Sequence, residues 1–359
     1  MPITFFILEL IFVSIISVMF YLSMQVYSSR VIFIPQGSTN SIISYLSKSG
    51  YELNVVDNIS LRFFLGYPQS GWIDLEKTKM TKGDFLYKLT TSKAAMRTVT
   101  LIPGDTYYEF FQNIANELGL SFDILLEAYN ELKYQDDGNI IADSYNIPIG
   151  MDEQFLMYYL ISHTQKRYSE MSHKIFGEYN KLNWYRYLTV ASIVQKEAAN
   201  DQEMPIVASV VYNRLSRGMP LQMDGTLKYG QHSKRTITPA IIREEDTPYN
   251  TYKYKGVPPS PICNVSVGAI IAAIKPKNTD FLYFVRDKTT RTHIFSKTYN
   301  EHLANINYTR VKESSTPIRS VATPTKPIPK IHEKNQIEPS VLSEPTKPID
   351  IKSLFENIR

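Results

Sequence analysis

The pattern of hydrophobic and polar positions begins with one long apolar run. Residues 3–27 are almost continuously apolar, interrupted mainly by Glu9 and by small polar residues. About 20 apolar residues suffice for a helix to cross a bilayer. The run lacks a basic start and a small-residue cleavage site before Arg30, so the pattern favours an uncleaved transmembrane anchor over a signal peptide. Because the first cation follows the run, the positive-inside rule leaves the orientation of this anchor nearly open.

Two strand–turn–helix patterns follow the anchor. A β-rich run from Val31 meets a Pro/Gly turn and then a helical pattern. The same order recurs further along the chain, where Asp105 or Thr106 would cap the helix. The recurrence predicts two small α+β units, residues 31–98 and 99–135. The alternative is chance recurrence of a common strand–turn–helix unit.

A helical pattern from about residue 152 leads into the stretch that carries the main candidate for chemistry. At 100° per residue, Val190, Ile193 and Val194 share one narrow face, and Glu197 falls in the middle of it. Burial raises the pKa of a carboxyl group, and a raised pKa is what a general acid needs near neutral pH. The alternative is a partly buried, hydrogen-bonded structural glutamate.

The next segment carries a second helix and a buried cation. Asn200 and Glu203 have the spacing of a capping box for a helix that stops at Gly218. Arg214 lies within the apolar stripe of that helix and needs a carboxylate or another hydrogen-bonded partner. From the pattern alone, a structural ion pair is the simpler interpretation.

Composition narrows the class of protein only modestly. The 359 residues suggest two or three domains, and a net charge of +4 does not require a nucleic-acid partner. The 25 tyrosines against two tryptophans suit contacts with a carbohydrate or another polar polymer. The single cysteine, Cys263, cannot form an internal disulfide. No Cys/His cluster with metal-ligand spacing, glycine-rich phosphate loop or serine nucleophile elbow occurs.

The C-terminal segment changes character. Residues 311–359 are rich in proline, serine, threonine and lysine, and residues 324–328 recur as 345–349. Such a composition predicts a disordered, semi-extended tail.

An ordered set of motifs resembles the MltG/YceG-like family of endolytic murein transglycosylases. The resemblance covers about residues 31–310. Its motifs are Asp137 to Pro148, Ala191 to Glu197, Ala208 to Leu215, Gly218 to Thr226, Tyr249 to Tyr252, Gly256 to Ile262, Phe281 to Val285, His293 to Phe295, and Glu301-His302.

The chain departs from the family pattern at several positions. The family usually has Glu-Lys-Glu where this chain has Gln195-Lys196-Glu197, and Asp-Pro-Thr where it has Asp224-Gly225-Thr226. A proline is usual where Val265 stands, and the linker signature differs at two further places, Asp137 and Ala142. None of these changes removes Glu197, to which we assign catalysis.

Together, the residue pattern and the resemblance predict an α+β architecture in five parts, of which the C-terminal tail is not part of the family pattern. The resemblance places a single-pass anchor at residues 3–27 in the cell inner membrane, with everything after it in the periplasm. A small α+β module (31–98), a LysM-like α+β module with the linker signature (99–150) and a YceG-like catalytic domain (151–310) precede the tail.

The resemblance also implies the reaction and its residues. The enzyme would cleave the bond between N-acetylmuramic acid and N-acetylglucosamine within nascent peptidoglycan strands, end their elongation and leave 1,6-anhydro ends. Glu197 would act first as acid and then as base. No metal or cofactor is expected; the partners would be glycan strands, the inner membrane and peptidoglycan synthases. Candidate substrate-binding residues are Gln222, Asp224, Thr226, Asn250, Asn213, Arg214 and His293.

Two other functions remain open. A non-catalytic peptidoglycan-binding scaffold would use only the anchor and the LysM-like module. A hydrolytic muramidase would need a second carboxylate beside Glu197, and Asp224 is the candidate for it.

Overall fold

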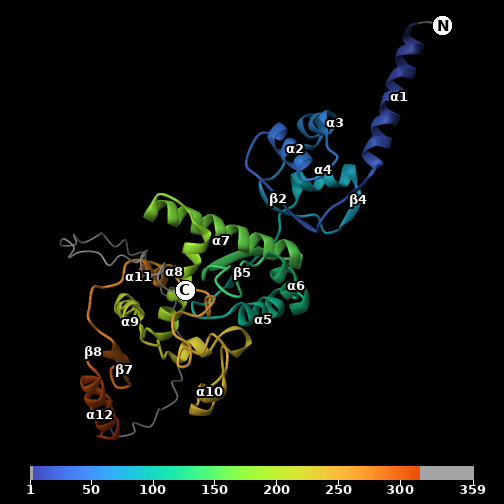
Figure 1. The fold of residues 1–359 in the computed structure, drawn as a ribbon. Coiled ribbons are helices and arrows are strands. Elements are labelled where there is room, and N and C mark those ends of the chain that lie inside the picture. Colours follow the sequence, from blue (N-terminus) through green and yellow to red (C-terminus); the bar gives the residue numbers. More distant parts are fainter. Residues whose placement is uncertain (1–2, 316–359) are drawn as a thin grey trace. The chain divides into compact units, whose positions relative to one another are not determined.

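A computed structural model describes residues 3–315 and divides the chain into two compact units. Unit 1 comprises Met1–Tyr134 and Ala142–Met171, and unit 2 comprises Gln135–Ile141 and Ser172–Arg359. Figure 1 shows the ribbon with its element labels. The fold mixes helices with short strands, and every strand among the described residues pairs in a two-stranded antiparallel sheet.

Helix α1 (Ile3–Ser23) has none of its side chains buried and a mean hydropathy of 2.5 over its most apolar window. Its 21 residues would extend about 31 Å at 1.5 Å per residue, close to the thickness of a bilayer core. Its length and composition therefore suit a membrane span. The predicted span of residues 3–27 is too long, because Gln25–Tyr27 form strand β1, whose backbone pairs with strand β4 (Lys79–Thr81).

The end of α1 is fixed to the first module by a group of polar side chains, here called the α1 joint: Tyr21, Asp57 and Lys82. The Tyr21 hydroxyl donates to Asp57 Oδ2 at 2.8 Å, and Lys82 Nζ donates to the Tyr21 hydroxyl at 2.9 Å. Lys82 Nζ lies 4.0 Å from the Asp57 carboxylate, and both side chains are buried. Since buried charges need partners, these contacts hold helix and module together.

The first module contains a strand–helix–helix–strand unit around one apolar core. Strand β2 (Val31–Ile34) pairs with β3 (Gly71–Asp74), and the core lies between this pair and the helices. The helices of this module are α2 (Thr39–Lys48), α3 (Val55–Ser60), its π-helical continuation η1 (Leu61–Leu65), and α4 (Lys82–Thr91).

The second module has the same order of elements. Strand β5 (Met96–Thr100), helix α5 (Tyr107–Leu118), helix α6 (Phe122–Leu132) and strand β6 (Ser144–Pro148) follow one another, and β5 pairs with β6. Thr106 caps α5, as its sequence predicts. The recurrence of strand, turn and helix is therefore present in the fold. Because β5 begins at Met96, the predicted border between residues 98 and 99 falls inside a strand.

The predicted helical run into Glu197 is two helices. Helix α7 (Glu153–Phe176) ends at Gly177, whose φ of 78° is a left-handed conformation that favours glycine, and Asn180 caps α8 (Lys181–Glu197). In unit 2, α8 packs against α9 (Met204–Ser216) and α11 (Val267–Ile274).

The remaining elements of unit 2 are short, except for the last helix. They are η2 (Asp224–Leu227), η3 (Gly230–His232), α10 (Pro239–Glu244), the hairpin β7 (Tyr283–Asp287) and β8 (Thr292–Ser296), and α12 (Tyr299–Ser315). Helix α12 continues to Ser315, so the first residues of the predicted tail are helical. The rest of that tail lies outside the described residues.

Candidate active site

Helix α8 places Glu197 at its C-terminal end. Val190, Ile193 and Val194 on the same face are fully buried, as the periodicity predicts. Glu197 is only partly exposed, at the wall of a cavity. The apolar stripe anchors the helix in the core, and the carboxyl group emerges where the stripe ends.

One hydrogen bond orients the Glu197 carboxyl group. The main-chain N–H of Gly225, in η2, donates to Glu197 Oε1 at 2.8 Å. Thr251 stabilises this turn, because its hydroxyl accepts from the N–H of Met223 at 3.1 Å. When the carboxyl group is protonated, Oε1 is the acceptor and the proton belongs on Oε2.

The environment raises the pKa of Glu197 to about 7. Desolvation is the main cause and the negative charge of Asp224 adds to it, while the Gly225 N–H and the charge of Lys228 act in the opposite direction. The C-terminal end of α8 also disfavours a negative charge. The carboxyl group can therefore both donate and accept a proton near neutral pH.

The cavity beside Glu197 has a volume of about 340 Å³. It combines a cation, an anion and several aromatic rings, a mixture that suits a polar ligand with apolar faces. Its lining consists of Glu197, Arg214, Leu221, Gln222, Met223, Asp224, Tyr252, Tyr283, Phe284, Tyr299 and His302.

Arg214 reaches the cavity from α9 with its guanidinium held by carbonyl oxygens. It donates to the main-chain oxygens of Leu282 at 2.6 Å and of Leu221 at 2.7 Å. These carbonyls are the hydrogen-bonded partners that the sequence pattern allowed as the alternative to an ion pair. Its guanidinium carbon lies 5.2 Å from the centre of the Tyr283 ring. Burial lowers the pKa of Arg214, yet its high ordinary value leaves the side chain charged.

Gln222 is held in a strained backbone conformation at the edge of the cavity. Its φ is 52°, which non-glycine residues rarely adopt. Its N–H donates to the carbonyl of Thr251 at 3.1 Å, and its side-chain oxygen accepts from Arg214 at 3.4 Å. Such strain is typical of functional sites.

Asp224 lies in the same cavity with one oxygen already engaged. The Tyr252 hydroxyl donates to Asp224 Oδ1 at 2.7 Å. Burial and the neighbouring carboxylate raise the pKa of Tyr252, so the hydroxyl keeps its proton. Asp224 thus supplies a negative charge near Glu197.

Two predicted ligand residues support the loops instead of lining this cavity. Thr226 is fully buried and donates to the carbonyl of Met223 at 2.7 Å. Asn250 is also fully buried and donates to the carbonyls of Ile242 at 2.9 Å and Glu245 at 2.8 Å. Both side chains hold the loops that carry Asp224 and Tyr252.

Asn213 and His293 are likewise absent from the cavity lining. Asn213 donates to the carbonyls of Thr279 at 2.7 Å and Phe281 at 3.0 Å, which ties α9 to the segment before β7. His293 lies on β8 and contacts Glu203: its N–H donates to Oε1 at 2.8 Å, and its Nδ1 lies 2.7 Å from Oε2.

The Glu203 contacts also correct the predicted capping box. Asn200 does accept from the N–H of Glu203, at 3.1 Å. The Glu203 carboxylate, however, accepts from the N–H of Ala199 at 3.2 Å and from His293. Only half of the box forms, because a histidine from a distant strand competes for the carboxylate.

Four aromatic residues of the cavity had no predicted role: Tyr252, Tyr283, Tyr299 and His302. The His302 ring stacks on Tyr283, with centroids 5.2 Å apart and planes at 22°. Burial and the nearby charge of Arg214 lower the pKa of His302, so its ring is neutral near pH 7. The adjacent pair Glu301-His302, already noted as a motif, was the signal that could have identified this residue.

Gln195, the most conspicuous departure from the family pattern, faces away from the site. Its side-chain oxygen accepts from the N–H of Ser266 at 3.1 Å and from the Ser266 hydroxyl at 2.8 Å, at the start of α11. An amide oxygen accepts these two bonds as a carboxylate oxygen would. Gln195 therefore acts as an acceptor at the start of α11 and does not line the cavity.

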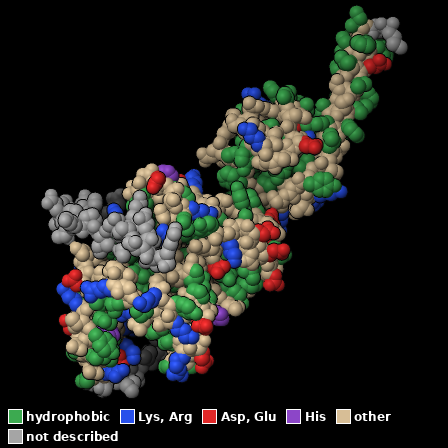
Figure 2. Space-filling model, in the orientation of Figure 1, with side chains coloured by type: hydrophobic (Ala, Val, Ile, Leu, Met, Phe, Trp, Pro, Cys, Tyr) green, Lys and Arg blue, Asp and Glu red, His purple; other side chains and the backbone are tan. Residues whose placement is uncertain are grey.

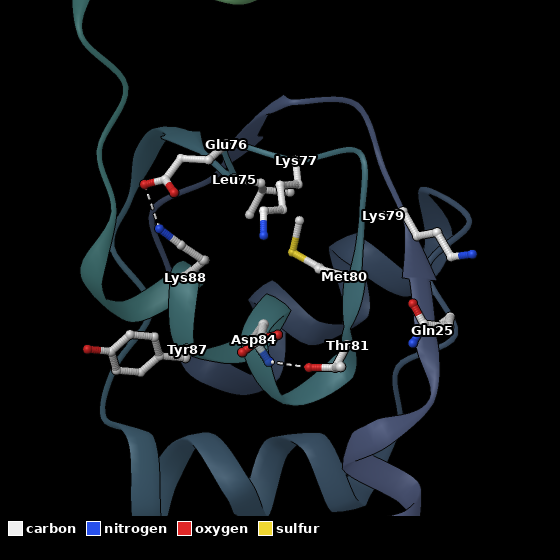
Figure 3. Close-up of a pocket in the computed structure, with 10 residues that line it drawn as sticks. All are labelled: Gln25, Leu75, Glu76, Lys77, Lys79, Met80, Thr81, Asp84, Tyr87 and Lys88. Carbon is white, nitrogen blue, oxygen red and sulfur yellow. Dashed lines mark hydrogen bonds and ion pairs between the residues drawn. The ribbon is translucent and has the colours of Figure 1, made fainter.

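A second cavity, of about 350 Å³, lies in the first module and differs in its charges (Figure 3). Lys88 Nζ donates to Glu76 Oε1 at 2.6 Å, and the hydroxyl of Thr81 accepts from the N–H of Asp84 at 3.1 Å. The side chain of Glu76 is largely exposed. No buried acid lines this cavity, so we assign the chemistry to Glu197. Across residues 3–315, no group of three or more His, Cys, Asp or Glu side chains is placed to hold a metal ion.

Comparison with known proteins identifies the family to which the chain is similar. The model of the YceG-like family matches residues 32–308. A Bacillus subtilis protein named endolytic murein transglycosylase is 30% identical over 301 residues, which cover 75% of this chain and 81% of that protein. A Streptococcus pneumoniae protein of the same name is 31% identical over 179 residues, or 48% of this chain and 32% of that protein. A solved yceG-like protein from Listeria monocytogenes covers 79% of this chain and 99% of its own, at 24% identity and a TM-score of 0.49.

Proposed function

The chain belongs to the YceG-like family and is a lytic murein transglycosylase, and we propose that it cuts peptidoglycan strands internally at the bond from N-acetylmuramic acid to N-acetylglucosamine. One observation carries this proposal: Glu197, with a pKa of about 7, lies at the wall of a cavity rich in aromatic side chains. A single group that gives and takes a proton is what a cyclising cleavage requires.

In the first step, protonated Glu197 transfers its Oε2 proton to the bridging oxygen. The bond between that oxygen and the anomeric carbon of N-acetylmuramic acid breaks, and the N-acetylglucosamine side leaves as an alcohol. Oε1 keeps its bond to the Gly225 N–H during this transfer. Positive charge grows on the anomeric carbon, and Asp224 provides a negative charge in the same cavity.

In the second step, the Glu197 carboxylate takes the proton of the 6-hydroxyl of the same N-acetylmuramic acid. The 6-oxygen bonds to the anomeric carbon and forms a 1,6-anhydro ring. No water is consumed, and Glu197 returns to its protonated form. One carboxyl group therefore suffices, whereas hydrolysis requires two. In an anhydro end the anomeric carbon is bonded to the 6-oxygen of the same sugar and carries no leaving group, so elongation stops at that end.

The other cavity residues would bind the glycan. Arg214 and Gln222 present polar groups, and Tyr252, Tyr283 and Tyr299 present rings on which sugar faces can pack. Thr226, Asn250 and Asn213 would act by holding the loops, and His293 by fixing β8. We assign these four residues positioning roles.

We further propose that α1 anchors the chain in the inner membrane, with the catalytic unit on the periplasmic side. The length and hydropathy of α1 support the anchor. Murein lies outside that membrane, and this location supports the orientation. The two strand–helix–helix–strand modules would be LysM-like, and peptidoglycan synthases would supply the strands.

The test uses the full chain in detergent on purified peptidoglycan, with wild type and Glu197→Gln compared. Mass spectrometry should find new 1,6-anhydro ends with wild type and none with the variant. New reducing ends would instead indicate hydrolysis and assign Asp224 as the second carboxylate. If the wild-type chain binds peptidoglycan but does not cleave it, the result would favour a non-catalytic peptidoglycan-binding scaffold.

A further inference from the structure

An exposed apolar surface covers the α3–η1 segment of the first module. Phe63 and Phe64 are 75% and 82% exposed. Contiguous apolar side chains on a folded surface indicate an interaction site. We call this set the α3 surface: Val55, Val56, Ile59, Phe63, Phe64 and Tyr67.

The α3 surface lies opposite the buried side of the same helical segment. Asp57 and Leu61 are fully buried against the module. Val55, Ile59 and Phe63 recur every four residues on the other side and face solvent. The segment thus has one apolar side for the core and a second that no residue in the described range 3–315 covers.

The charges around the α3 surface suit a membrane. Between Leu53 and Gly71 the charged residues are Asp57 and Arg62. Asp57 is buried in the α1 joint, so Arg62 is the exposed charge of this segment. Aromatic and aliphatic side chains beside a cation match the lipid–water interface, where rings partition and cations meet phosphate groups.

The α1 joint places this segment at the end of the membrane helix. The Tyr21 hydroxyl, in the last turn of α1, donates to Asp57 in the first turn of α3. Figure 1 shows α2 and α3 on the side of the first module towards which α1 extends, and Figure 2 shows hydrophobic side chains on that side. The end of a membrane span lies at the bilayer surface, so α3 begins there as well.

We propose that the α3 surface inserts into the interface of the bilayer that α1 spans. This inference rests on the anchor proposed above and adds a second membrane contact to it. Phe63 and Phe64 would enter the boundary of the acyl chains, and Arg62 would contact lipid phosphates. The first module would then lie on the membrane instead of standing clear of it.

Site-directed spin labelling of the full chain in lipid nanodiscs tests this proposal. Cys263→Ser removes the only cysteine; single labels are then placed by Phe64→Cys, by Lys77→Cys as an exposed control on the same module, and by Val13→Cys within α1. Oxygen concentrates in lipid and a nickel chelate stays in water, so collisions with each report depth. At residues 13 and 64, oxygen accessibility should exceed nickel accessibility, and at residue 77 the order should reverse.

Each of the other possible labelling results would contradict a different part of the proposal. If the label at residue 13 is lipid-exposed and that at residue 64 behaves like that at residue 77, the anchor holds and the α3 surface does not insert. A label at residue 64 shielded from both reagents would mean that a protein, such as a second copy of the chain, covers this surface. Water-like accessibility at residue 13 would overturn the anchor itself. Thermal unfolding of each labelled chain shows whether it is folded.

Discussion

Glu197 and Glu203 lie on either side of the turn between α8 and α9, yet their surroundings shift the two pKa values in opposite directions. Glu197 accepts one main-chain N–H, and its pKa rises to about 7. Burial alone would also raise the pKa of Glu203, but the N–H and ring of His293 and the N–H of Ala199 together lower it.

The difference shows that the number of hydrogen-bond donors around a glutamate carboxylate, more than its burial, determines whether its pKa is raised or lowered. Three donors fix Glu203 as a charged structural group that joins α9 to β8. A single donor leaves Glu197 able to exchange a proton with a ligand. Five predictions test this contrast.

The largest expected effect is the loss of cleavage in Glu197→Gln. An amide keeps an oxygen for the Gly225 N–H but cannot transfer a proton. General acid–base catalysis contributes about 10²- to 10⁴-fold, so the rate of anhydro-end formation should fall by about 10³-fold. The melting temperature should not fall. A folded Glu197→Gln chain that still forms anhydro ends at the wild-type rate would remove Glu197 from the catalytic assignment.

Glu203→Ala should lower the free energy of unfolding and should not act directly on the cleavage reaction. It leaves the His293 and Ala199 donors without their acceptor, and three unsatisfied buried donors should cost about 3 kcal/mol. Urea unfolding measures this loss. Glu203→Gln, which keeps an acceptor oxygen, serves as the milder control. Full stability of Glu203→Ala together with lost cleavage would mean that Glu203 takes part in the reaction.

The two glutamates should also differ in how they link stability to pH. Glu197 binds its proton more tightly in the folded state, so it contributes stability at low pH that is lost as pH rises from its ordinary 4.5 to about 7. Its replacement in Glu197→Gln should remove about 3–4 kcal/mol of this pH dependence, at about 1.4 kcal/mol per pKa unit. Glu203, with a lowered pKa, contributes stability above its ordinary pKa that is lost as pH falls through the lowered value. Parallel pH profiles of Glu197→Gln and Glu203→Gln would contradict the contrast.

Gly225→Ala should disturb Glu197 directly. A Cβ at this position would lie 2.8 Å from Glu197 Oε1 and 2.8 Å from Lys196 Cβ, so the turn or the carboxyl group must move. We expect about a tenfold lower rate, as for other small displacements of catalytic groups. If this displacement breaks the hydrogen bond from the main-chain N–H of residue 225, the pKa of Glu197 should rise further, and with it the pH above which the rate declines. Gly268→Ala is the matched control, because its nearest neighbouring atom would be 3.7 Å away. Equal rates for both variants would contradict a role for the Gly225 contact.

Gln195→Glu should have the smallest effect. The side chain caps α11 through Ser266 and does not line the cavity, so cleavage should stay within about twofold. A carboxylate at a helix N-terminus adds about 0.3–1 kcal/mol, which a small rise in melting temperature would show. A large gain in activity would place residue 195 in the reaction.

Local periodicity predicted the parts of the site that depend on one helix. Glu197 lies at the end of the buried stripe of Val190, Ile193 and Val194, because side-chain direction along a helix follows from spacing alone. The cap at Thr106 follows equally local rules. These features required no knowledge of distant partners.

Contacts between distant segments account for the wrong predictions. For Arg214 the simpler interpretation was an ion pair, but the carbonyls of Leu221 and Leu282 satisfy it, which is the alternative of another hydrogen-bonded partner. The Glu203 carboxylate was assigned to Asn200 but binds His293, which lies far away in the sequence. The predicted span was too long because Gln25–Tyr27 pair with β4. In each case the partner is brought close only by the fold, and a single sequence does not show which carbonyls or donors will face a side chain.

The α1 joint has a consequence for how far the first module can move. A tethered domain searches a volume that grows with the length and flexibility of its linker. Here α1 ends at Ser23 and β1 begins at Gln25, and Met24 between them accepts the N–H of Lys82 through its carbonyl at 2.8 Å. The connection between α1 and the first module therefore contains no flexible linker. With α1 in a bilayer, the module would follow the tilt of its helix, which averages about 20° in membrane proteins, and any longer reach would have to come from residues beyond this module.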